Sequence, residues 1–190
     1  MHYIPASSPP KALDVQAFAS ESGVLDGVDS LEHYPRLPSD QFKPDEASQL
    51  STPIKVHWHA EGELRTVSVA AHQVWLHLGA QVALPMTCQR CLKTVALPVE
   101  AKQSFRFVSS EQQAESEDDD AEEDLLVLTK HFDLHALVED ELLLAIPMVP
   151  MHDVCPEPQV FAGQDPDFEL QEAAAPHPFA VLASLKVKKH

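Results

Sequence analysis

Apolar residues recur at every second position through much of the segment 54–108, and this alternation restricts the fold more than any other feature. Short segments that alternate, or that are rich in β-branched or aromatic residues, lie at 55–59, 66–70, 73–78, 81–84, 94–99 and 103–108. A period of two is typical of strands with one buried and one exposed face. The sequence therefore predicts an antiparallel β-sheet or a small, partly open barrel over 54–108.

Turn signals divide this strand series. Glu61-Gly62 and Gly79-Ala80 predict turns between short strands, because glycine adopts turn conformations readily. Pro85 and Pro98 fall near predicted strand ends, where a missing N–H is tolerated. The predicted strands are therefore only four to seven residues long.

The segments on either side of the strand series add helices. Residues 1–50 form an N-terminal segment whose apolar series fits short strands or a helical turn equally well, and 109–124 reads as a flexible acidic loop. Residues 133–155 read as a helix followed by a proline-rich extended segment, 156–176 as a linker and 177–190 as a C-terminal segment with helical spacing. We therefore expect an α+β fold in a single domain, 1–190, with one helix after the acidic loop and one at the C-terminus.

The helix after the acidic loop has clear start and stop signals. Asp133 is a suitable N-cap, and apolar residues follow it at helical spacing, with Glu139 and Asp140 expected to point outward. Pro147 and Pro150 are expected to end the helix and to keep the following segment extended.

Charge and cysteine content restrict the environment and the partners. The chain has a net charge of -17, so a phosphate backbone is repelled unless the few cations lie together. Three cysteines are too few for a secreted disulfide framework. The sequence shows neither a signal peptide nor a membrane-spanning apolar run. These features predict a cytoplasmic protein with no membrane partner.

The sharpest local motif is Cys88-Gln89-Arg90-Cys91. Two thiols on a tight turn can hold one tetrahedral metal ion, and His152 and Cys155 offer the other two ligands of a Cys3His zinc site. Two reduced cysteines with no ligand are the interpretation that the motif alone favours, ahead of a zinc site. A redox pair fits less well, because such pairs open a helix after a strand. Zn²⁺ is therefore a candidate cofactor, and no other cofactor is indicated.

Cations gather after this motif. Between Cys88 and Arg106 the sequence carries four of them against one acid, Glu100; the four are Arg90, Lys93, Lys102 and Arg106. They predict a contact with phosphate or with an acidic partner, or an ordinary solvated face. So few cations give only a modest affinity for RNA.

No catalytic constellation is present. His57 and His59 share a strand face and could bind a metal, but solvated positions of this kind are ordinary. Glu139, Asp140 and Glu141 are not accompanied by a nucleophile or a positioned base, and no phosphate-binding glycine loop or hydrolase motif occurs. The sequence therefore predicts that the protein is not an enzyme.

Three blocks of the sequence resemble the YceD family of bacterial proteins, described as large ribosomal RNA subunit accumulation proteins. The blocks are Cys-Gln-Arg-Cys at 88–91, Leu-Val-Glu-Asp-Glu-Leu-Leu-Leu-Ala-Ile-Pro-Met-Val-Pro-Met-His at 137–152 and His-Pro-Phe-Ala-Val-Leu-Ala-Ser-Leu-Lys at 177–186. The third block begins with His177 where the family usually has asparagine, which puts any amide contact there in doubt. The resemblance implies a role in the synthesis, processing or stability of 23S rRNA, and it implies no catalytic residue.

The charge and the resemblance together favour an acidic adaptor that binds a ribosomal protein or an assembly factor of the large subunit, with rRNA contacted indirectly. The expected contact regions are the basic residues near the Cys-x-x-Cys motif and four residues of the C-terminal segment, namely Phe179, Leu182, Leu185 and Lys186. The alternative is a zinc-binding module that contacts nucleic acid directly through Arg90, Lys93, Lys102 and Arg106.

Overall fold

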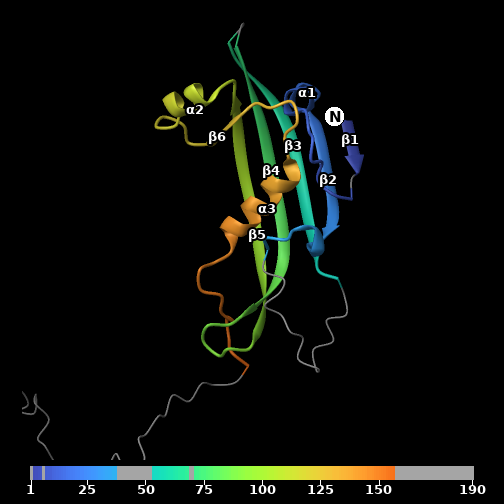
Figure 1. Cartoon of the computed structure of the whole chain (residues 1–190), viewed down its shortest axis with the longest axis vertical. Coiled ribbons are helices and arrows are strands. Elements are labelled where there is room, and N and C mark those ends of the chain that lie inside the picture. The colour runs from blue at the N-terminus through green and yellow to red at the C-terminus, as the bar shows by residue number, and fades with distance from the viewer. Residues whose placement is uncertain (1, 6, 38–52, 69–70, 157–190) are drawn as a thin grey trace, which may run out of the picture. The chain divides into compact units, whose positions relative to one another are not determined.

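A computed structural model of the chain describes residues 2–5, 7–37, 53–68 and 71–156. Its strands follow one another across a six-stranded sheet in sequence order: β1 (His2–Pro5), β2 (Gly23–Ser30), β3 (Lys55–Ser68), β4 (Ala71–Thr87), β5 (Thr94–Val108) and β6 (Asp124–Val127). The helices are α1 (Val15–Ser20), α2 (Glu111–Glu117) and α3 (Leu134–Ala145), with a 3-10 turn at Leu31–His33. Figure 1 shows the long central strands with α3 in front of them.

The predicted α+β class is confirmed. Strands β2 to β5 pair in antiparallel fashion, whereas the two outer strands pair in parallel, β1 with β2 and β6 with β5. The sheet is therefore mixed, and among the described strands it stays open and does not close into a barrel. The N-terminal segment, whose structure the sequence left undecided, supplies both α1 and β2.

The central strands are longer than predicted, and the two predicted turns were wrong. Gly62 lies inside the 14-residue β3, and Gly79 lies inside the 17-residue β4. Gly62 is required for a different reason: a Cβ there would lie 2.9 Å from the Ala19 Cα of α1, so its absence lets the helix approach the strand. The short predicted segments are therefore parts of β3, β4 and β5, apart from residues 69–70, which lie outside the described residues.

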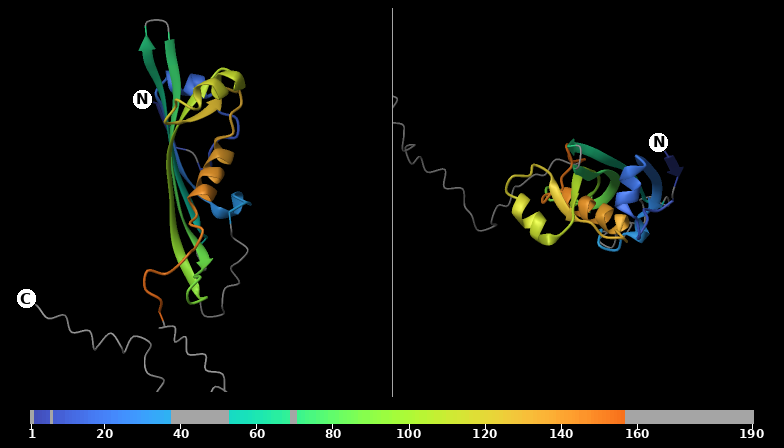
Figure 2. Two further views of the ribbon diagram at one scale, coloured as in Figure 1. Left: turned by 90° about the vertical axis from the view of Figure 1, so that its left-hand side faces the viewer. Right: turned by 90° about the horizontal axis from the view of Figure 1, so that it is seen from above.

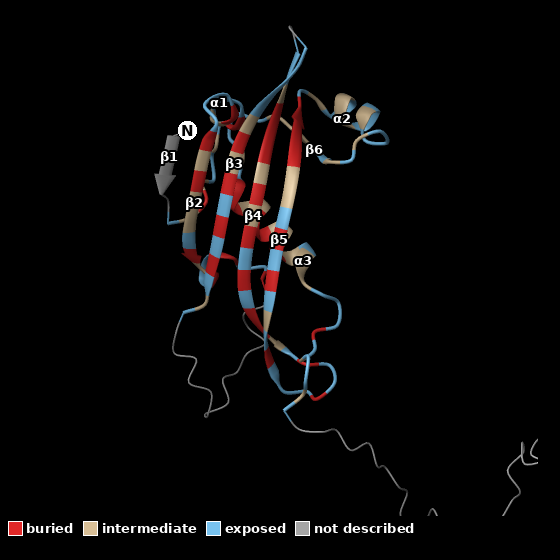
Figure 3. Ribbon diagram, turned by 180° about the vertical axis from the view of Figure 1, so that it is seen from behind, coloured by how far each residue is buried: buried red, intermediate tan, exposed pale blue. Residues whose placement is uncertain are grey.

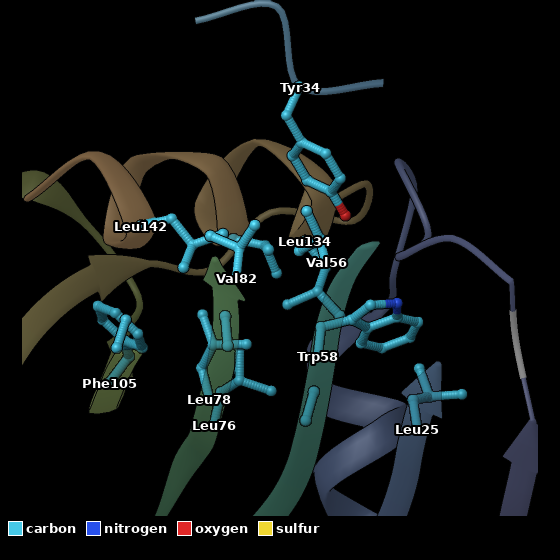
Figure 4. Close-up of a cluster of buried hydrophobic side chains, with 14 of the residues drawn as sticks. Leu25, Tyr34, Val56, Trp58, Leu76, Leu78, Val82, Phe105, Leu134 and Leu142 are labelled. Atoms are coloured by element: carbon cyan, nitrogen blue, oxygen red, sulfur yellow. The ribbon is translucent and has the colours of Figure 1, made fainter. Parts of the chain in front are cut away.

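One face of the sheet is covered by helices (Figure 2). Figure 4 shows Leu134 and Leu142 of α3 over Val56 and Val82 of the sheet, and all four are buried. As predicted, the Asp133 carboxylate caps α3, accepting a hydrogen bond from the Ala136 N–H at 2.9 Å, and the helix ends before Pro147. No helix among the described residues is long and apolar enough to span a membrane.

The acidic segment 109–124 is not a flexible loop throughout, so that part of the prediction is corrected. Ser110 caps α2 by accepting a hydrogen bond from the Gln113 N–H at 3.3 Å. The guanidinium of Arg106 pairs with Glu117 at 2.5 Å and with Glu123. A buried cation thus offsets the like charges that led us to expect disorder.

Glu139 also differs from expectation, because it is buried and does not point outward. The residue is only 4% exposed, and its carboxylate accepts hydrogen bonds from the backbone N–H and the Nε of Arg36, at 2.7 and 2.8 Å. Arg36 also pairs with Asp140 at 2.5 Å. Two segments 103 residues apart in the sequence are joined by this network.

The opposite face of the sheet carries no helix among the described residues. Buried and exposed positions alternate along the strands (Figure 3), because successive side chains point to opposite faces. His57 and His59 both lie exposed on this face, as the alternation predicts. Glu63 accepts hydrogen bonds there from Arg65 at 2.8 Å and pairs with His77 at 3.0 Å. These contacts, the one with Arg65 foremost, lower the pKa of Glu63 to about 2.

This lowered pKa gives a pH-dependent contribution to stability. Because the pKa of Glu63 is lower in the folded state, its contribution is complete above the ordinary value of 4.5 and is lost as the pH falls towards 2. We expect Glu63→Gln to destabilise the protein at pH 7 by less than about 1 kcal/mol, since the pair is exposed. Urea unfolding between pH 7 and 3, with Glu61→Gln as control, should show this difference narrowing below about pH 5; a difference that is constant with pH would contradict the assignment.

Candidate metal centre

The turn between β4 and β5 holds the first two cysteines. Thr87 and Thr94 pair at the end of the hairpin, and residues 88–93 form the connection. The Cys88 N–H donates to the Lys93 carbonyl at 2.9 Å, and the Leu92 N–H donates to the Cys88 carbonyl at 2.8 Å. The turn therefore lies between two strands, as the sequence predicted.

The extended segment after α3 brings the other two residues to this turn. The Gln89 N–H donates to the Pro150 carbonyl at 2.8 Å, and the Arg90 guanidinium donates to the His152 carbonyl at 2.8 Å. Because both bonds are made by the residues between Cys88 and Cys91, the turn itself positions the second segment.

Four potential ligands meet here: Cys88, Cys91, His152 and Cys155, the set that the sequence indicated. Their ligand atoms all lie within 4.8 Å of one another, with Cys88 Sγ 4.0 Å from Cys155 Sγ and Cys91 Sγ 3.4 Å from His152 Nδ1. A tetrahedral zinc site with its usual bond lengths has edges of about 3.8 Å between sulfurs and about 3.6 Å between sulfur and nitrogen. This cluster could hold a metal ion.

The surroundings of Cys88 favour the thiolate that a metal requires. Burial raises its pKa, but hydrogen bonds from the backbone N–H groups of His152, Cys91 and Arg90 outweigh burial and lower the pKa to about 5. The His152 N–H lies 3.4 Å from the sulfur. These backbone N–H groups therefore favour the thiolate form of Cys88, which is the form that binds metals.

Cys155 differs in this respect. Burial, followed by hydrogen bonds to Cys91 and Cys88, raises the pKa of Cys155 to about 11. A metal ion would displace its proton, because thiolates and not thiols bind metals.

Cys88, Cys91 and Val95 also form a small apolar cluster separate from the main core, with Met86 and Cys155 packed against it. Cys88 and Cys91 are thus buried, whereas His152 and Cys155 are partly exposed.

The structure does not bring the four predicted cations together. Arg90 and Lys93 lie on the turn, Lys102 lies along β5 with its amine 2.6 Å from Glu100, and Arg106 lies near the far end of that strand. Thr94 to Arg106 spans about 40 Å of extended chain. Arg106 is 8% exposed and pairs with two acids, so it cannot form part of an exposed basic patch.

The other predicted contact residues are Phe179, Leu182, Leu185 and Lys186, which lie outside the described residues, as do the predicted linker from 157 onward and the C-terminal segment. The uncovered sheet face has a hollow of about 570 Å³, lined by His59, His77 and Lys102 among others. Within the described residues, the only group of three or more candidate ligands that could hold a metal ion is the cluster at the turn.

Comparison with known proteins finds a family match over the part of the chain that contains the metal cluster. Residues 76–186 match the family model "Large ribosomal RNA subunit accumulation protein YceD", a range that includes all four cluster residues. The protein of that name from Haemophilus influenzae is 38% identical over 113 residues, which are 57% of this chain and 63% of the relative. The match thus spans less than two thirds of the relative's length. No solved structure matches the chain.

Proposed function

The chain belongs to the YceD family, and from this premise we propose that it supports the accumulation of 23S rRNA in the large ribosomal subunit without catalysing a reaction. The observation that carries the proposal is the family match, which covers 76–186 and includes the metal cluster. The absence of a catalytic motif in the sequence agrees with a binding role.

We propose that it acts as an adaptor for a basic ribosomal protein or assembly factor. A net charge of -17 attracts basic proteins and repels a phosphate backbone. The described cations offer no concentrated site for RNA, since Lys102 and Arg106 lie away from the turn and both are paired with acids. Contact with rRNA would then be made through the partner.

We propose that the cluster is a structural zinc site. Three sulfurs and one imidazole nitrogen are the donors that zinc prefers, and four protein ligands leave no open position for a substrate or a water molecule. Zinc would fasten the segment that follows α3 to the β4–β5 turn.

Deletion of the gene in a bacterial host tests the main proposal. We expect the ratio of 23S to 16S rRNA to fall and the wild-type chain to restore it, because the factor is required for accumulation of the large-subunit RNA. Quantitative RNA gels and gradient profiles of ribosomal particles measure this. Restoration by a chain with Lys130→Ala, a surface control away from the metal cluster, is also expected. An unchanged ratio after deletion would refute the role in accumulation.

The second candidate is a zinc-binding module that contacts nucleic acid directly. The observation in its favour is Arg90, which lies between two of the cluster cysteines and is exposed. Ultraviolet cross-linking of gradient fractions at low and high salt distinguishes the two functions. Recovery of rRNA with no basic protein would favour the module, whereas recovery of a basic protein whose binding weakens with salt would favour the adaptor.

A further inference from the structure

Exposed apolar side chains concentrate around the metal cluster. Five large apolar residues lie within four positions of a cluster residue and are between 44% and 99% exposed; they are Leu92, Met148, Val149, Met151 and Val154. We call these five residues the apolar patch. Water-exposed apolar side chains that occur together are typical of interaction surfaces, and methionine is common on such surfaces because it adapts to its partner.

Leu92 gives the strongest single indication. Its φ of 57° lies in the left-handed region, which a side chain with a Cβ occupies at a cost of about 1 kcal/mol or more. The side chain is 74% exposed, so the described fold gains almost no burial from it. Glycine would adopt this conformation without the cost. A strained and exposed leucine therefore points to a contact outside the described fold.

The charge around the patch is balanced. Residues 88–93 and 147–156, which we call the metal lobe, carry two cations, Arg90 and Lys93, and one acid, Asp153. Three thiolates and one Zn²⁺ add a charge of -1, so the loaded metal lobe is neutral within a chain of net charge -17. Contact at the metal lobe would then depend on apolar burial, while the field of the whole chain would select a basic partner.

Other occupants fit these observations less well. RNA is repelled by the charge of the chain, and the patch contains no aromatic ring on which a base could stack. A second copy of the chain carries the same charge of -17, so the two copies repel each other.

We propose that the apolar patch is the docking surface for an apolar helix face or strand of a basic protein. The proposal deepens the adaptor function and rests on it. The neutral metal lobe supplies the apolar contact, zinc keeps its two segments together, and the acidic remainder of the chain attracts the basic residues that flank the partner's apolar face.

Photo-cross-linking in cells tests this proposal. A benzoylphenylalanine placed at Leu92 in the full chain should cross-link to a basic ribosomal or assembly protein, at a peptide with an amphipathic pattern identified by mass spectrometry. The same group at Val67, which is 61% exposed on β3, serves as control and should not give that product. Cross-links to RNA, to a second copy or to residues 177–190 of the same chain would each overturn the proposal.

A matched variant separates this proposal from the adaptor function. Leu92→Gly should leave the melting temperature unchanged or higher, because glycine removes the strain, yet weaken binding of the cross-linked protein about tenfold or more. Binding equal to wild type would overturn the docking surface even if the chain still restored the 23S to 16S ratio. Failure of the proposed role in rRNA accumulation would appear instead as an unchanged 23S to 16S ratio after gene deletion.

Discussion

Replacing Cys88 with serine is expected to reduce bound zinc from one ion per chain to less than about a tenth of an ion. Cys88 is fully buried and carries the thiolate with the lowered pKa, so its loss removes the ligand that is best prepared for a metal. Structural zinc sites in small domains bind with about 10–16 kcal/mol at neutral pH, and the loss of one of four ligands removes much of that energy. Metal analysis of the purified protein by mass spectrometry measures the result.

Histidine variants provide the matched control. His152→Ala should also lose zinc, because His152 Nδ1 lies 3.4 Å from Cys91 Sγ within the cluster. His131→Ala, which changes an exposed histidine outside the cluster, should keep one ion per chain. If the wild-type chain, purified with zinc in the medium and without chelators, contains no metal, the three cysteines of the cluster are simply reduced thiols and the zinc proposal is wrong.

The loss of zinc should affect the metal lobe and leave the sheet folded. The main core of Leu76, Leu84, Trp58 and their neighbours is a separate cluster from Cys88, Cys91 and Val95. Hydrogen exchange of Cys88–Leu92 and of 147–155 should therefore speed up in Cys88→Ser, while exchange within β3 and β4 stays slow. Global unfolding on zinc removal would instead show that the core depends on the metal.

The metal cluster could be predicted from the sequence because ligand chemistry is local. Cys88 and Cys91 share a turn, His152 and Cys155 share one short segment, and only one set of thiols is available. What the sequence did not contain is the reason that the two segments meet. The bonds from Gln89 and Arg90 to the backbone of 150–152 depend on main-chain positions, which residue type does not indicate.

The lengths of the strands could not be predicted from the sequence. Alternation located the sheet correctly, but Gly62 and Gly79 were interpreted as turns, because glycine is common in turns. Gly62 instead lies against α1, whereas a Cβ at Gly79 would meet no atom within 4 Å. Only the position of α1 against β3 shows that Gly62 is there for close approach. The prediction of a flexible loop at 109–124 was wrong for a related reason. Arg106, which pairs with two of its acids, lies on β5, so a count of the charges within the segment does not include it.

Glu139 was also misjudged, and the error has a measurable consequence. A carboxylate among other acids on a helix is predicted to be solvated. The Glu139 carboxylate instead binds Arg36, which comes 103 residues earlier in the chain. Glu139 belongs to the block that resembles the YceD family, and its hydrogen bonds with Arg36 give it a structural role.

Glu139→Ala should therefore destabilise the fold strongly. The substitution removes two hydrogen bonds with Arg36, at 2.7 and 2.8 Å, from a residue that is only 4% exposed. Charge-assisted bonds of this kind contribute about 1.5–3 kcal/mol each, so we expect a loss of about 3 kcal/mol in the free energy of unfolding. For a chain of this size that corresponds to a melting temperature lower by about 10 °C. Urea unfolding and calorimetry at pH 7 measure both values.

Glu141→Ala on the same helix is the matched control, and it should behave in the opposite way. Burial, together with the negative charges of Asp124 and Asp140, raises the pKa of Glu141, so its ionised form is disfavoured in the folded protein. Removing it should leave stability at pH 7 unchanged or slightly higher, and any gain should fade as the pH falls and the wild-type carboxylate becomes protonated.

Equal losses of stability in both variants would show that α3 is sensitive to any shortened side chain and that the bonds to Arg36 are not the cause. A loss confined to Glu139→Ala would establish that this carboxylate fastens α3, and with it the start of the segment that carries His152 and Cys155, to the N-terminal part of the fold.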